Sequence, residues 1–404
     1  MTLAGPAGTL ASNIRMEERK RKVLKVAEES ETARDTGEVL IVKNLKVSRE
    51  RKFGGVYCGM PIREFLNTGF AFGDSVDLRF SNGFTLLDIP YYNGFYNGIG
   101  EPLLVGYSGK PEIEARLNYG DDLWRLGGFT GSETVTISLH EASKYLEIQK
   151  ASYITYSDKR EDYGSDTVFA NFRTLSGGRM KEGTFYRSAS PCDNVHRRAP
   201  FTDRLLGEAG VSFVLNLADS MEEVREYLRE PEFSSSAFER LYRLGRVRAM
   251  ELSMNFRSKD FAEGLAEGLR ATLCSDGPVL IHCTEGKDRT GFVCALLEGL
   301  CGASYEEIRC DYMLTYENYY GVSKERDEKR YGAIVKNNLD LMLRFLMEKF
   351  AQEKAGKEIR TGWQETLSGC YFEEPARRYL QDAGFTKQEL KRLVDMAEGQ
   401  IFLR

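Results

Sequence analysis

Two short runs of apolar residues limit most strongly how this 404-residue chain can fold. Val211–Leu217 (V-S-F-V-L-N-L) and Pro278–His282 (P-V-L-I-H) are largely apolar and do not alternate with polar residues. Strands of this kind are buried on both faces, which is typical of parallel sheets covered by helices. Helical patterns lie between and after these runs, at residues 260–273, 289–300, 305–316, 331–354 and 387–398. The sequence therefore predicts an α/β domain with a mostly parallel central sheet flanked by helices.

The preceding part of the chain has a different pattern. From Gly37 to about Glu147, segments rich in Val, Ile, Leu and Tyr are separated by Gly-Asp, Asn-Gly and Gly-Gly steps. Thr134–Leu139 alternates polar and apolar residues, as a half-buried strand does. Short strands with frequent turns favour a small all-β, barrel-like or sandwich domain. We therefore expect a flexible N-terminal arm, a β-rich domain and the α/β domain, over residues 1–36, 37–150 and 151–404.

Composition excludes several classes of function. The net charge of −5 argues against a nucleic-acid-binding protein that works through its overall charge. No apolar run approaches the roughly 18 residues of a transmembrane segment, and no signal peptide is recognisable. The eight cysteines are scattered, without a C-x-x-C pair or a zinc-ligand spacing, so we expect no metal site. These features favour a cytoplasmic protein, with secretion left open if the start is truncated.

The segment that carries chemistry begins at the end of the second apolar run. It reads H-C-T-E-G-K-D-R-T-G from His282 to Gly291. A Cys and an Arg at this spacing are common by chance, but the added His and two glycines make the pattern specific. Its context of buried strand, tight loop and helix also fits a site that binds an anion at a helix N-terminus.

The residue types in this segment suit a phosphate ester. Converging backbone N–H groups at the start of a helix hold a phosphate dianion, and Gly286 permits backbone shapes that a Cβ would oppose. Arg289 offers a planar fork that matches two phosphate oxygens. The same field favours the ionised sulfur of Cys283, which would attack phosphorus and form a phosphocysteine. The predicted phosphate-binding residues are Thr284, Glu285, Gly286, Lys287, Asp288 and Arg289.

Two neighbouring residues have predicted supporting roles. Thr290 can donate a hydrogen bond to the sulfur and help it leave in the second step. We expect His282 to orient the loop through hydrogen bonds, because a thiolate needs no base. Thiolate chemistry also needs no metal or organic cofactor, so none is expected.

The ten-residue segment resembles the signature H-C-x-x-G-x-x-R-[ST]-G of the cysteine-dependent protein tyrosine phosphatases. With Lys287 and Asp288 it is most similar to the bacterial atypical tyrosine phosphatases that also accept phosphoinositides. The resemblance extends to Asn171-Phe172-Arg173, to residues 183–189 (G-T-F-Y-R-S-A) and to residues 311–318 (D-Y-M-L-T-Y-E-N). It implies a phosphatase domain with helical insertions over residues 151–404. It also implies a phosphorylated protein or a phosphoinositide as substrate.

The chain departs from the family's pattern in ways that leave the general acid open. Asn216-Leu217-Ala218 stands where the family usually has D-L-R, and Thr174 and Ser176 replace the Asp and Gly of N-F-R-D-L-G. The resemblance implies Asp288 as the proton donor. Asp219 and Asp260 are alternatives, since either could lie at the carboxyl edge of the sheet. Asp260 is also a candidate N-cap of the next helix.

Several other residues and segments have two possible roles. Lys287 could attract a second substrate phosphate, or it could be solvated or paired with Glu285. Arg197, Arg198 and Arg309 are expected to be surface charges. The helix around residues 331–354 could be a lid over the site or ordinary core. The alternative functions are an inositol-polyphosphate (phytase-like) cysteine phosphatase and a non-catalytic phosphate-binding module, followed by another thiolate–oxyanion enzyme such as an arsenate reductase or sulfurtransferase.

Overall fold

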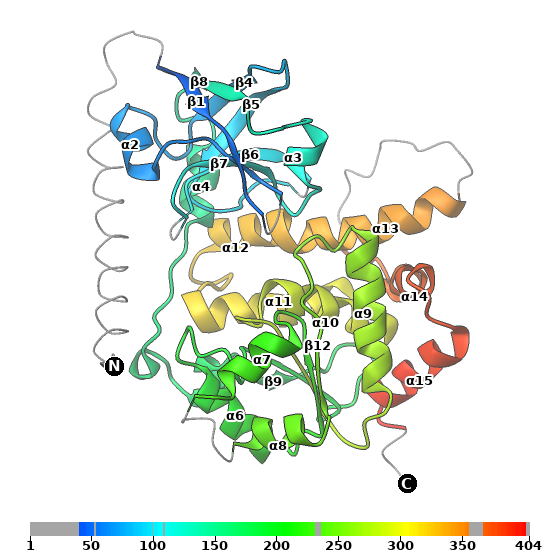
Figure 1. Ribbon diagram of the computed structural model, residues 1–404. Helices are drawn as coiled ribbons and strands as arrows, with labels where there is room; N and C mark the ends of the chain where they lie inside the picture. Colours follow the sequence, from blue (N-terminus) through cyan, green and yellow to red (C-terminus); the bar gives the residue numbers. More distant parts are fainter. Residues whose placement is uncertain are drawn as a thin grey trace. The chain divides into compact units, whose positions relative to one another are not determined.

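The computed structural model describes residues 40–51, 54–98, 100–107, 110–230, 236–354 and 367–400 (Figure 1). The chain divides into two compact units, Met1–Tyr153 and Ile154–Arg404. The predicted arm over residues 1–36 lies outside the described residues. None of the helices in the described part of the chain has the length and apolar character needed to cross a membrane.

The first unit is built on an eight-stranded sheet in the order β1-β8-β4-β5-β6-β7-β3-β2. Its end strands β1 and β2 are consecutive in the chain, so the sheet is a nearly closed barrel, as predicted. All neighbouring strands run antiparallel except β5 and β6, which are parallel. The strands are β1 (Ile41–Lys46), β2 (Ser48–Arg49), β3 (Val56–Tyr57), β4 (Ser75–Phe80), β5 (Thr85–Tyr92), β6 (Pro102–Val105), β7 (Glu114–Leu117) and β8 (Thr134–Glu141). The helices of this unit are α2 (Ile62–Asn67), α3 (Leu123–Leu126) and α4 (Leu146–Ser152).

The second unit contains a five-stranded sheet in the order β12-β11-β13-β10-β9. The strands are β9 (Arg173–Thr174), β10 (Phe185–Ser188), β11 (Phe213–Asn216), β12 (Val247–Ala249) and β13 (Val279–His282). All pairs are parallel except β9 with β10. Every residue of β11 and β13 is buried, which confirms the two strands predicted from the apolar runs. Asn216 pairs with His282, so the chain leaves both strands at the same edge of the sheet.

Helices surround this sheet (Figure 1). They are η2 (Arg160–Asp162), α5 (Asp166–Phe169), α6 (Ala199–Glu208), α7 (Met221–Tyr227), α8 (Ala237–Arg243), α9 (Lys259–Thr272), α10 (Asp288–Leu300), α11 (Tyr305–Tyr320), α12 (Glu328–Ile334), the π-helical turn η4 (Val335–Leu339), α13 (Asp340–Lys354), α14 (Glu373–Asp382) and α15 (Lys387–Ala397). The mostly parallel sheet with flanking helices confirms the predicted α/β fold. The helical pattern at residues 387–398 corresponds to α15, which begins with a capping box formed by Thr386 and Glu389.

The structure bears on two predictions, the N-cap of α9 and the role of the segment 331–354. The N-cap of α9 is Ser258, whose hydroxyl accepts a hydrogen bond from the Phe261 N–H at 3.1 Å. The expectation that Asp260 caps this helix is therefore wrong: the helix begins at Lys259, so Asp260 lies exposed within its first turn. The segment 331–354 supports the interpretation as ordinary core rather than as a lid, because many of its apolar residues are buried. These are Ile334, Val335, Leu339, Met342, Leu343 and Leu346.

Candidate active site

The predicted phosphate loop connects β13 to the start of α10. Gly286 has a φ of +67°, in the left-handed region that favours glycine. A Cβ at this position would lie 2.1 Å from the carbonyl oxygen of Ser188, on the neighbouring strand β10. Because that oxygen belongs to the backbone of the sheet, only glycine fits without moving the loop.

Three consecutive carbonyl groups of the loop are bound by the surrounding scaffold. The Thr284 carbonyl accepts from the Ser190 N–H at 3.0 Å, and the Glu285 carbonyl accepts from the Tyr319 hydroxyl at 2.6 Å. The Gly286 carbonyl accepts from Arg187 Nη2 at 2.8 Å. In contrast, none of the backbone N–H groups of residues 284–289 has a hydrogen-bond partner within the described ranges. The loop therefore holds unpaired amides beside the N-terminus of α10, which is an arrangement for binding an anion.

A buried polar network supports the loop from below. Arg187 is fully buried and forms an ion pair with Asp311, which also accepts from Arg173 Nε at 2.7 Å. Burial would raise the pKa of Asp311, but the two arginines lower it below its ordinary value. The Thr315 hydroxyl accepts from both arginines, at 2.9 and 3.3 Å, and the Asn171 amide bonds the Gly286 carbonyl at 3.3 Å. The three sequence stretches outside the loop that carry the family resemblance thus meet at its underside.

The side chains flanking the loop are buried. Cys283 is 3% exposed. His282 is fully buried, and burial lowers its pKa to about 3, so the imidazole is neutral at physiological pH and its Nδ1 lies 3.2 Å from the Cys283 carbonyl oxygen. A neutral ring in this contact suits an orienting role. The hydroxyl of Thr290 is buried without a hydrogen-bond partner among the described residues, and so is free to approach a sulfur or phosphate.

Arg289, at the second position of α10, reaches back across the carboxyl edge of the sheet. Its Nη1 donates to the carbonyl of Leu252 at 3.1 Å and, more weakly, to that of Ala218 at 3.4 Å. Its Nε is buried without a partner in the described part of the chain. The guanidinium is therefore held in place along one side and keeps donor capacity for a ligand.

Lys287 and Asp288 form an ion pair with each other. Lys287 Nζ lies 2.9 and 2.8 Å from the two carboxylate oxygens of Asp288 and 3.8 Å from Glu285. The lysine side chain is 16% exposed and its ammonium lies 5.8 Å from the centre of the Tyr316 ring. Burial opposes its charge, but Asp288 raises the pKa of Lys287 above its ordinary value. These contacts support the interpretation that Lys287 forms a salt bridge. Its main partner is Asp288 rather than Glu285.

The alternative acids differ in their surroundings. Asp219 follows β11, is 6% exposed and accepts from the Asn216 amide at 2.9 Å. Burial raises the pKa of Asp219 above its ordinary value, while Asn216 and the charge of Arg289 oppose this effect. Asp260 is exposed on α9. The structure thus brings Asp219 and Asp288 to the same edge of the sheet as Cys283.

Sequence reasoning missed an aromatic and basic cluster beside the loop. The hydroxyl of Tyr156 donates to the Glu285 carboxylate, and its ring stacks on Tyr319 with centroids 5.3 Å apart. The guanidinium of Arg198 lies 4.8 Å from the centre of each ring. Arg198 is 2% exposed, so the expectation of a surface charge is wrong: a ring of aromatic side chains and Asp158 covers it. Arg309 pairs with Glu306 and is partly exposed, and Arg197 is exposed.

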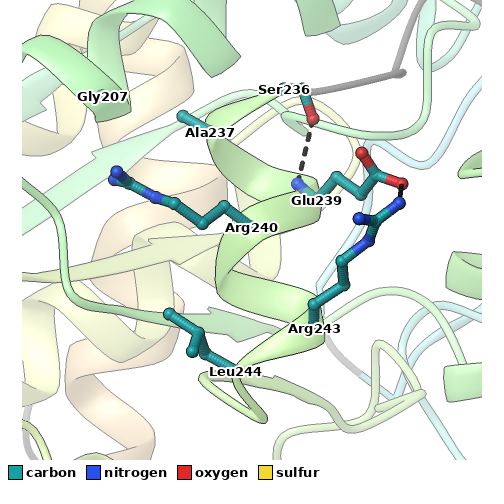
Figure 2. A pocket seen from close by; sticks show the side chains of 7 residues that line it. All are labelled: Gly207, Ser236, Ala237, Glu239, Arg240, Arg243 and Leu244. Carbon is teal, nitrogen blue, oxygen red and sulfur yellow. Dashed lines mark hydrogen bonds and ion pairs between the residues drawn. The ribbon is translucent and has the colours of Figure 1, made fainter.

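A separate hollow lies on α8 (Figure 2). Its lining consists of Gly207, Ser236, Ala237, Glu239, Arg240, Arg243 and Leu244. Arg243 forms a salt bridge with the Glu239 carboxylate at 2.7 Å, and the Glu239 backbone N–H donates to the Ser236 hydroxyl at 2.9 Å. None of the predicted site residues lines this hollow, so it contributes nothing to the chemistry of the loop.

Comparison with known proteins agrees with the fold. A mostly parallel sheet with a Cys-to-Arg loop at the head of a buried helix suits a phosphomonoester hydrolase. The chain belongs to the tyrosine phosphatase family, whose model matches residues 167–396. It is also 44% identical over 121 residues to a tyrosine-protein phosphatase of Nostoc commune. That alignment covers 29% of this chain and only 38% of the relative's length.

Proposed function

We propose that this protein is a phosphatase that hydrolyses phosphotyrosine in proteins through a phosphocysteine on Cys283. The observation that carries the proposal is the loop itself. Its carbonyls at residues 284–286 are tied to the scaffold, whereas the amides of residues 284–289 are unpaired within the described chain. Cys283 lies at one end of this set of donors and Arg289 at the other, which suits a bound dianion.

The first chemical step transfers the phosphoryl group to sulfur. The Cys283 thiolate attacks phosphorus, a P–S bond forms, and the P–O bond to the tyrosine oxygen breaks. The departing phenolate takes a proton from a carboxylic acid of the site. Arg289 and the loop amides bind the equatorial oxygens, where charge lies in the transition state.

The second step regenerates the enzyme. Water attacks the phosphocysteine, the P–S bond breaks, and inorganic phosphate leaves. The carboxylate formed in the first step accepts a proton from the attacking water. The Thr290 hydroxyl, buried and without a partner in the described residues, donates a hydrogen bond to the departing sulfur.

We propose Asp288 as the proton donor, with Asp219 as its rival. The side chain of Asp288 is 24% exposed at the loop, whereas Asp219 is nearly buried. A proton donor must reach the leaving oxygen, which lies on the solvent side of phosphorus, and this favours Asp288. The raised pKa of Asp219 is the observation in favour of the rival.

The test measures phosphate release by the full chain from a phosphotyrosine peptide and from p-nitrophenyl phosphate. The wild type should hydrolyse both. Asp288→Asn should slow the peptide reaction by about 100-fold and the p-nitrophenyl reaction much less, because nitrophenolate leaves without a proton. The same pattern in Asp219→Asn alone would exchange the two roles. A wild type that binds the peptide and releases no phosphate would be a binding module.

A further inference from the structure

We infer that the carboxylate of Glu285 is a specificity-determining group that disfavours substrates carrying a second phosphate close to the first. The favoured substrate class is then a phosphotyrosine peptide with a single phosphate and neutral or basic neighbours. This inference rests on the proposed function, because it concerns the substrate of the same loop.

Glu285 is held from two sides. Its carboxylate accepts the Tyr156 hydroxyl, and its carbonyl accepts the Tyr319 hydroxyl at 2.6 Å. Burial raises the pKa of each phenol far above its ordinary value, with the charge of Glu285 adding to this for Tyr156, so both hydroxyls stay protonated and donate. The side chain of Glu285 is 27% exposed. Its negative charge therefore has a defined position two residues after the attacking sulfur and remains in contact with solvent.

Tyr156 and Tyr319, the two side chains that hold Glu285, rest on a rigid base. Arg198, beneath the stacked rings of Tyr156 and Tyr319, donates to Asp158 at 3.0 Å and to the carbonyls of Ser157 and His196 at 3.1 and 2.8 Å. A buried guanidinium with this many partners loses little further freedom when a substrate binds. Tyr156 and Asp158 precede the residues that match the family, whereas Arg198 and Tyr319 lie within them.

The ammonium group of Lys287, which could otherwise bind a second phosphate, is already paired with carboxylates. Lys287 binds both oxygens of Asp288 and lies 3.8 Å from Glu285. With Asp288 protonated as the proposed proton donor, Glu285 and Lys287 balance each other, and with Asp288 ionised the three residues carry one net negative charge. Arg289 is assigned to the reacting phosphate. A second phosphate near this group would meet a fixed carboxylate rather than a free ammonium, and like charges at short range repel.

The experiment compares two peptides that share one phosphotyrosine, of which one also carries a phosphothreonine two residues away. The readout is the ratio of kcat/KM between the two peptides for each form of the full chain. His196 lies 3.8 Å from Glu285, so all assays are run at one fixed pH. Wild type should prefer the singly phosphorylated peptide by about five- to tenfold at low salt.

Glu285→Gln keeps the size of the side chain and an oxygen that can accept the Tyr156 hydroxyl, but it removes the charge. We expect this variant to bring the ratio close to one. The matched control is Glu182→Gln, which removes an equal charge from an exposed site at the amino end of β10, the sheet edge opposite the loop. It should leave the wild-type ratio unchanged.

Salt provides an independent measurement that does not rely on a variant. Raising the ionic strength to about 1 M shortens the screening length to about 3 Å, so the wild-type preference should shrink while that of Glu285→Gln should not change. A wild type that prefers the doubly phosphorylated peptide, or a ratio that Glu285→Gln leaves in place, would overturn the inference. Absence of hydrolysis of both peptides would instead overturn the proposed function.

Discussion

Replacing Cys283 with Ser should lower the rate of phosphate release from a phosphotyrosine peptide by about 10⁴-fold or more, the scale expected when a covalent nucleophile is removed. A serine hydroxyl has nearly the size of the thiol, but it is not ionised at neutral pH. The unpaired amides of the loop and the Arg289 guanidinium do not depend on the sulfur. The variant should therefore still bind the peptide, with a Kd measurable by calorimetry.

The matched control for this variant is Cys310→Ser, on the exposed side of α11. It makes the same atomic change on an exposed side chain outside the loop and should keep wild-type turnover. If Cys283→Ser folded normally and retained more than about 1% of the activity, a nucleophile other than this sulfur would have to carry the reaction.

The second large effect is expected from Arg289→Lys. Lysine keeps the positive charge but cannot present two parallel donors to two phosphate oxygens. It would also lose the contacts to the carbonyls of Leu252 and Ala218 that fix the direction of the side chain. We expect kcat to fall by about 10²- to 10³-fold, the scale of losing a preorganised donor to transition-state charge. Inhibition by vanadate, which mimics the transition state, should weaken in parallel.

Arg309→Lys serves as the control for this substitution. Arg309 is partly exposed and pairs with Glu306 on the same helix, so the change preserves its charge outside the loop. Its kcat should remain at the wild-type value. An Arg289→Lys enzyme with unaltered kcat and unaltered vanadate inhibition would show that charge alone, without the forked geometry, is sufficient.

Local sequence patterns predicted the parts of the fold that local physics determines. The apolar runs at residues 211–217 and 278–282 became the fully buried strands β11 and β13. The helical pattern at residues 387–398 became α15. The position of the loop between β13 and α10 followed from the same reasoning, because a strand and a helix flank the Cys-to-Arg segment in the sequence itself.

Contacts between distant residues account for what the sequence could not show. The hydroxyl of Tyr156 meets Glu285 across 129 residues, and no pattern near either residue indicates it. The burial of Arg198 depends on aromatic side chains from separate segments, including Tyr156 and Tyr319. The choice of Asp288 as the main partner of Lys287 depends on side-chain directions at the helix start, which spacing alone leaves open.

The most direct test of the account is to trap the phosphoenzyme. Wild-type protein is mixed with a ³²P-labelled phosphotyrosine peptide, quenched during turnover, and digested under conditions that preserve phosphocysteine, and the labelled fragment is identified by mass spectrometry. We expect the ³²P label on Cys283 of the wild type and no label in Cys283→Ser. Turnover with label on another residue, or label that persists at the same level in Cys283→Ser, would contradict it.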